Sequence, residues 1–166
     1  MKVTVAQLNP VVGDIQGNLQ KVMDVVSSYS SDAPDLVVFP EQFIVGYPAK
    51  DLLLKEKFIE NVLNALQEIV TFSAGYPGIG ILVGAPLPTG SQTGKGLYNS
   101  AVLIHDGAVL ITRHKSLLPS YDVFDETRYF DSVSHVVATP FKDHKLGISV
   151  CEDAWNDPKL WAGYKY

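Results

Sequence analysis

Short apolar runs that end at turn residues recur along the chain, and two segments of helical periodicity lie between the first three of them. The run at residues 35–39 (DLVVF) is apolar after its first residue and stops at Pro40. Such runs are typical of strands buried within a sheet, and their alternation with helices indicates a layered α/β fold in which helices cover a sheet. The predicted strands are residues 3–8, 35–39, 79–85, 99–105, 108–113, 133–139 and 145–151.

Two segments, residues 15–31 and 55–73, repeat apolar residues at the spacing of an amphipathic helix. Asp14 is placed to cap the first of them, and Asp157-Pro158 predicts the start of a third helix. Asp106-Gly107 between two apolar runs predicts a β-hairpin. The Gly-, Ser- and Pro-rich residues 86–96 predict a surface loop.

Composition favours one globular domain over residues 1–166, because 46% of the residues are hydrophobic. A net charge of -5 excludes the basic footprint of a nucleic-acid binder. No apolar run reaches the roughly 18 residues of a membrane span, and the N-terminus lacks the pattern of a signal peptide. A single cysteine forms no intrachain disulfide, so we expect a cytoplasmic protein.

Metal and nucleotide motifs are incomplete. The four histidines show no metal-ligand spacing and only one cysteine is present, so no metal site is predicted. The Gly94-Lys95 pair resembles part of a phosphate loop, but Thr89 stands at the first glycine position and Gly96 at the Ser/Thr position. No cofactor is predicted for this part of the protein.

The only cysteine, Cys151, lies in GISVCEDAW with two carboxylates directly behind it. A lone cysteine is more often a small buried hydrophobe than a nucleophile, and acidic neighbours disfavour the thiolate. The end of a strand, however, is where α/β folds place ligands. Glu41 and Lys115 also directly follow predicted strands.

Alone, Glu41 and Lys115 would form an ordinary salt bridge. With Cys151 they make a complete set for amide chemistry: the thiolate attacks a carboxamide, the carboxylate moves the thiol proton to departing ammonia, and the ammonium stabilises the oxyanion. In this hypothesis Lys115 offsets the acidic neighbours of the thiol, and Glu152 contributes mainly its backbone N–H.

Three motifs resemble the nitrilase, or carbon-nitrogen hydrolase, superfamily, whose members use a Glu-Lys-Cys triad in that chain order. They are FPEQFIVGYPAKDLLL, HKSLLPSYDVFDETRYF and GISVCEDAW. Within the superfamily, CEDAW and LPSYDVFDE are most similar to the glutaminase domain of glutamine-dependent NAD+ synthetases. The resemblance implies a four-layer α-β-β-α sandwich, of which residues 1–166 would be the N-terminal portion, truncated after the strand that carries the nucleophile.

Carried over by this resemblance, Glu41 is the general base, Lys115 the oxyanion-stabilising cation and Cys151 the nucleophile that forms a γ-glutamyl thioester. Glu126 resembles a second glutamate that orients the lysine and the substrate. The alternative for Glu126 is a simple ion pair with Arg128.

Two aromatic residues resemble substrate contacts of the family. Tyr121 is similar to a substrate-contacting tyrosine, and Trp155 matches a position that lines the glutamine pocket, next to Glu152. The alternative for both aromatics is ordinary packing.

The resemblance also implies partners and cofactors. The ammonia would pass to a synthetase domain, absent from residues 1–166, that uses ATP and Mg²⁺ to amidate nicotinic acid adenine dinucleotide. An unfinished sheet would favour homo-oligomers. Two alternatives stay open: an amidase or nitrilase that acts on another carboxamide or nitrile, and a catalytically silent structural fragment in which the triad is not assembled.

Overall fold

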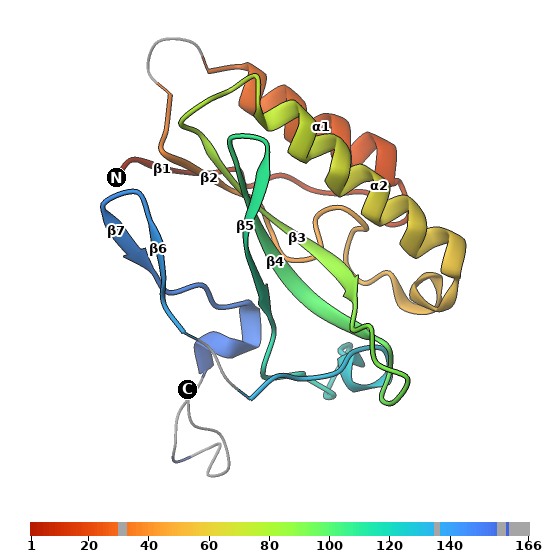
Figure 1. Ribbon diagram of the computed structural model, residues 1–166. Helices are drawn as coiled ribbons and strands as arrows, with labels where there is room; N and C mark the ends of the chain where they lie inside the picture. The colour runs from red at the N-terminus through yellow and green to blue at the C-terminus, as the bar shows by residue number, and fades with distance from the viewer. Residues whose placement is uncertain (30–32, 135–136, 156–158, 160–166) are drawn as a thin grey trace.

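The computed structural model describes residues 1–29, 33–134, 137–155 and 159, and its largest feature is a five-stranded sheet in the order β1-β2-β3-β4-β5 (Figure 1). The first three strands run parallel, and the last two join them antiparallel. The strands are β1 (Val3–Val5), β2 (Leu36–Val38), β3 (Gly80–Pro88), β4 (Leu97–His105) and β5 (Ala108–His114). The predicted α/β class is confirmed.

Helices α1 (Ile15–Ser27) and α2 (Glu56–Ser73) lie together on one side of this sheet (Figure 1). The Asp14 carboxylate accepts the N–H of Gly17 at 2.9 Å, so the predicted cap is confirmed. Helix α1 is shorter than the predicted segment 15–31. Its end is fixed by Ser28, whose hydroxyl donates to the carbonyl of Val25 and competes with helical hydrogen bonding.

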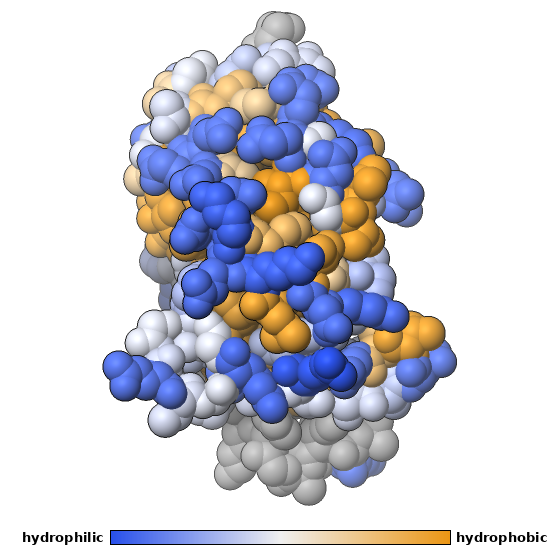
Figure 2. Space-filling model, turned by 90° about the vertical axis from the view of Figure 1, so that its right-hand side faces the viewer, coloured by the Kyte–Doolittle hydropathy of each residue, from blue (hydrophilic) through white to orange (hydrophobic). Residues whose placement is uncertain are grey.

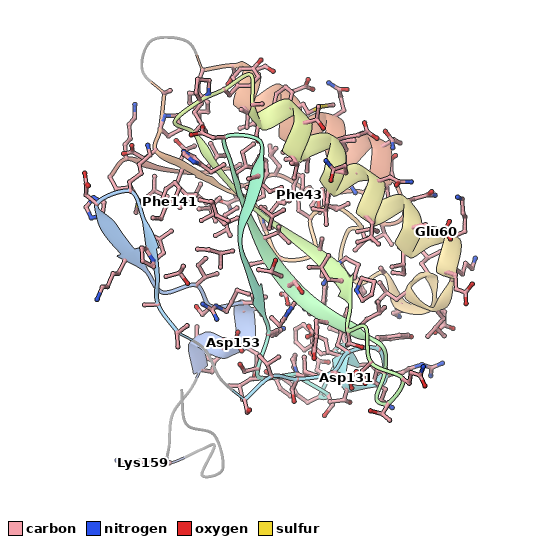
Figure 3. The ribbon with its side chains drawn as sticks, viewed as in Figure 1. Phe43, Glu60, Asp131, Phe141, Asp153 and Lys159 are labelled. Carbon is pink, nitrogen blue, oxygen red and sulfur yellow. The ribbon has the colours of Figure 1, made fainter. Side chains whose placement is uncertain are left out.

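A small hairpin lies on the opposite side of the sheet. It consists of β6 (Thr139–Phe141) and β7 (His144–Leu146), which pair antiparallel. Phe141 packs with Leu36 and Leu103 of the sheet, whereas Phe43 belongs to the larger core under the helices. The two phenylalanines therefore mark the two apolar layers of the fold (Figure 3).

Two predicted strands near the nucleophile are wrong in extent. Of the predicted strand 133–139, only Thr139 belongs to a strand among the residues described. Strand β7 ends at Leu146, and Cys151 begins a 3₁₀ helix, Cys151–Trp155. Ile148 and Val150 alternate into the core as in a strand, but within the described ranges no neighbouring strand pairs with them.

The other boundaries differ by a few residues. Strand β1 ends at Val5 rather than at residue 8, and β3 continues through Pro88 because its pairing with β4 extends that far, so the predicted loop 86–96 is shorter. The Asp106-Gly107 hairpin is confirmed, with positive φ angles of 49° and 77°. The predicted helix at Asp157-Pro158 lies outside the described residues.

The surface seen in Figure 2 carries hydrophilic side chains with hydrophobic patches exposed between them. In the described part of the chain, neither helix is both long and apolar enough to cross a membrane. The predicted homo-oligomer stays a prediction.

Candidate active site

Glu41 lies in the turn that follows β2, and Gly84 of β3 determines how closely that turn approaches the sheet. A Cβ at residue 84 would lie 2.3 Å from the backbone nitrogen of Gln42 and 2.7 Å from the carbonyl oxygen of Pro40. The turn is tied to the same strand because the N–H of Ile44 donates to the carbonyl of Gly84 at 3.1 Å. Glycine at this position is therefore what lets the Glu41 backbone lie against β3.

Lys115 follows β5 directly and is completely buried. Its Nζ donates to Oε1 of Glu41 at 2.7 Å and to the carboxylate of Glu126 at 2.9 Å. Burial alone would lower the pKa of Lys115, but the charges and hydrogen bonds of these two carboxylates outweigh it and raise the pKa above its usual value. The ammonium is therefore charged at neutral pH.

Glu126 begins a short 3₁₀ helix, Glu126–Arg128. The residue itself is only 3% exposed. Burial, followed by the nearby charge of Glu41, raises the pKa of Glu126, although Lys115 opposes the shift. Its carboxylate also accepts the hydroxyl of Tyr47 at 3.0 Å. The predicted approach of Glu126 to Lys115 is present, whereas the guanidinium of Arg128 lies 3.4 Å from Asp51.

Three polar residues of this cluster were missed by the sequence reasoning. The Nδ2 of Asn99 donates to Glu41 at 2.7 Å and to Glu126 at 3.3 Å, and its Oδ1 accepts from Gln42 at 2.7 Å. The third is Tyr47. An asparagine within the apolar strand β4 is the signal that would have pointed to this buried polar network.

Cys151 has a positive φ of 46° at the start of its 3₁₀ helix. Burial, then the charge of Glu41, raises the pKa of its thiol to about 11. Lys115 lowers the pKa but does not compensate, so the predicted offset by Lys115 is only partial. Cys151 and Glu41 line one cavity of about 100 Å³. The structure therefore brings all three predicted triad residues together.

Asp153 joins the segment of the nucleophile to the segment of the lysine (Figure 3). Its Oδ1 accepts the backbone N–H groups of Ser116 and Leu117, both at 2.9 Å, and its Oδ2 accepts the N–H of Val150 at 3.0 Å. The last bond is one half of a capping box at the start of the 3₁₀ helix, since the side chain of Val150 cannot accept a bond in return. Sequence reasoning did not single out this residue.

Of the other predicted substrate contacts, Tyr121 and Trp155 are exposed, whereas Glu152 is buried. The hydroxyl of Tyr121 donates to Glu152 at 2.9 Å, and this bond raises the pKa of Tyr121. The structure thus shows a contact of the buried Glu152 carboxylate, and the predicted role of its backbone N–H stays a prediction. Trp155 is 68% exposed and does not line the cavity that Glu41 and Cys151 share.

A second cavity, of about 330 Å³, lies beside the same cluster and is lined in part by Gln42, Tyr47 and Glu126. Among the residues that the structure describes, no group of three or more His, Cys, Asp and Glu side chains is placed to hold a metal ion. The groups that the structure brings together here are a carboxylate, an ammonium and a thiol.

Known proteins resemble both the sequence and the fold. A family model described as carbon-nitrogen hydrolase matches residues 2–162. The glutamine-dependent NAD(+) synthetase of Synechocystis sp. is 41% identical over 99% of this chain, and that of Thermotoga maritima is 36% identical over 94%. The chain spans only 29% and 26% of these two relatives.

Solved structures agree with the sequence matches. The glutamine-dependent NAD+ synthetase of Acinetobacter baumannii is similar with a TM-score of 0.80 and 34% identity, over 97% of this chain and 29% of that one. An amidase from Nesterenkonia sp. has a TM-score of 0.76 at 21% identity, a likeness of fold alone, with 58% of its chain covered. The nitrilase-type fold is thus confirmed, in part of its extent. With a family match over nearly its whole length, the chain belongs to the carbon-nitrogen hydrolase family, the nitrilase superfamily.

Proposed function

We propose that this site hydrolyses the side-chain carboxamide of glutamine through a thioester on Cys151. The observation that carries the proposal is that the thiol of Cys151 and the carboxylate of Glu41 line one cavity, with the buried ammonium of Lys115 2.7 Å from the carboxylate. A thiol, a base and a fixed cation within one site are the groups that acyl transfer from an amide needs.

In the first half of the reaction, Sγ of Cys151 forms a bond to the carboxamide carbon as Glu41 takes the thiol proton. Because the pKa of the thiol is raised to about 11, the thiol is protonated at neutral pH and needs this base. The carbonyl oxygen becomes an oxyanion, which the ammonium of Lys115 stabilises. When the C–N bond breaks, Glu41 returns the proton to the leaving nitrogen and ammonia departs.

In the second half, water attacks the thioester carbon while Glu41 takes a proton from the water. The C–S bond then breaks, glutamate is released, and the sulfur of Cys151 regains the proton from Glu41. The same carboxylate thus serves as base and acid in both halves, which requires that it stay within reach of the sulfur throughout.

Glutamine is proposed as the substrate because the relatives are named glutamine-dependent NAD(+) synthetases. By the same reasoning, the ammonia would serve an ATP- and Mg²⁺-dependent synthesis of NAD+ from nicotinic acid adenine dinucleotide on a part of the relatives that this chain does not cover. Tyr121, Glu126, Glu152 and Trp155 stay proposed substrate contacts.

The test is covalent labelling of Cys151 by the chloroketone analogue of glutamine, followed by intact mass, together with glutamate release from glutamine. We expect saturable single-site labelling that glutamine slows, and no labelling of Cys151→Ser. Protection by aliphatic amides or nitriles instead of glutamine would assign another substrate. Labelling at the rate of a free thiol, with no protection by any of these compounds, would refute an assembled site.

A further inference from the structure

Asn99 lies among Glu41, Lys115 and Glu126, and its side chain has no role in the proposed reaction. It is 1% exposed and belongs to β4. Its backbone carbonyl accepts the N–H of Lys115 at 2.8 Å. One residue therefore fixes the start of the lysine segment through its backbone and contacts both carboxylates through its side chain.

The amide of Asn99 can be oriented in only one way. Its two N–H groups serve two different carboxylates, at 2.7 Å for Glu41 and 3.3 Å for Glu126. Its carbonyl accepts the Nε2 of Gln42 at 2.7 Å. A flipped amide would turn Oδ1 toward both carboxylates and replace two attractive contacts by repulsive ones, so Gln42 and the carboxylates together determine the orientation.

The bonds to Glu41 distinguish its two oxygens. Lys115 and Asn99 both donate to Oε1, each at 2.7 Å. Oε2 is then the oxygen available for the thiol proton of Cys151, which lines the same cavity. Glu41 and Glu126 also repel each other across a single ammonium, and Asn99 offsets this repulsion by supplying one N–H to each.

We propose that Asn99 is a positioning residue whose amide fixes which oxygen of Glu41 takes the thiol proton and holds the two carboxylates on either side of Lys115. The inference rests on the proposed function, because it assigns Asn99 to the base of that reaction. Gln42, which orients the amide, acts one step further from the chemistry.

The experiment measures the inactivation of the full chain by the chloroketone analogue of glutamine, which separates the inhibitor constant from the maximal rate constant. Asn99→Leu keeps a similar volume but removes both donors. Because a hydrogen bond to a charged group is worth about a tenfold to hundredfold change in an equilibrium or rate, we expect the maximal rate constant to fall by that factor. The inhibitor constant should change by less than about threefold, since the lost bonds go to the base and not to the inhibitor.

The pH profile separates positioning from mere support of the fold. Asn99→Asp places a third carboxylate around one ammonium, which makes it harder for Glu41 to lose its proton. The acid limb of the pH profile, where the inactivation rate falls because the base is protonated, should therefore move to higher pH. Asn18→Leu is the matched control, since Asn18 is equally buried but bonds to the backbone of Val11 and Ile44. It should lower the melting temperature and leave the acid limb in place.

Gln42→Met provides a second variant if the Asn99 variants do not fold. It removes the donor that orients the Asn99 amide, so the maximal rate constant should fall in the same direction but by less. Unchanged rate constants and acid limb in folded Asn99→Leu or Gln42→Met would overturn the inference, as would a change confined to the inhibitor constant. A wild-type chain that the analogue does not label would instead overturn the proposed function.

Discussion

Replacing Lys115 by methionine tests whether the buried ammonium holds the site together. The lysine is completely buried and lies 2.7 Å from Glu41 and 2.9 Å from Glu126. Methionine fills a similar volume but leaves two carboxylates facing each other without a cation. Removing one partner of a buried ion pair costs about 3–5 kcal/mol. For a chain of this size, each kcal/mol corresponds to about 2–4 °C, so the melting temperature should fall by roughly 6–20 °C.

The pH dependence of this loss identifies its cause. Without the ammonium, the native state favours the protonated carboxyl group of Glu126, so its folded pKa, which is already raised, rises further above the unfolded value. Stability is then lost as the pH rises through that range, and the deficit should be smaller near pH 5 than near pH 8. Urea unfolding at both pH values measures it, with Lys57→Met as the control because Lys57 makes only an exposed pair with Glu60. A deficit no larger than that of the control, or equal at both pH values, would refute this reasoning.

Three smaller predictions follow from the same geometry. Gly84→Ala should displace the turn that carries Glu41, because its Cβ would lie 2.3 Å from the backbone nitrogen of Gln42. The chloroketone should therefore label Cys151 of this variant more slowly, even at temperatures where the variant is fully folded. Asp14→Ala should cost about 1 kcal/mol in urea unfolding through loss of the α1 cap, without changing the labelling rate. Glu126→Gln should flatten the pH dependence of stability: the raised pKa of Glu126 favours the native state at low pH, and this contribution is lost as the pH rises through the folded pKa. An equally steep profile in calorimetry would contradict the last of these.

The sequence predicted the elements whose signals are local. The apolar runs and the helical periodicity located β2 to β5 and both α-helices. In these segments the spacing of the apolar residues along the sequence is enough to indicate which side chains are buried. The strand predicted up to Cys151 was wrong because a strand also needs a partner for its backbone. Ile148 and Val150 have the alternation, but pairing depends on residues distant in sequence.

The same distinction applies to the site. Glu41, Lys115 and Cys151 were found from their positions after apolar runs and from the family motifs. Asn99 was missed because an asparagine within an apolar strand indicates a buried polar network but does not identify the residues that it will contact. Asp153 was missed for a similar reason, since its three bonds join backbone groups of residues 116, 117 and 150.

The raised pKa of the Cys151 thiol fits the proposed chemistry better than a lowered one would. A permanent thiolate next to Glu41 and Glu126 would add a third negative charge to a cluster with one cation, and the acidic side chains would oppose it. If the proton instead stays on sulfur until the substrate binds, the net charge does not change as the proton moves from Sγ to Glu41. Negative charge then passes from the carboxylate through sulfur to the substrate oxygen, where the ammonium of Lys115 can stabilise it. The acidic surroundings disfavour a permanent thiolate. They are compatible with a thiol that loses its proton to Glu41 only as the sulfur attacks the carboxamide carbon.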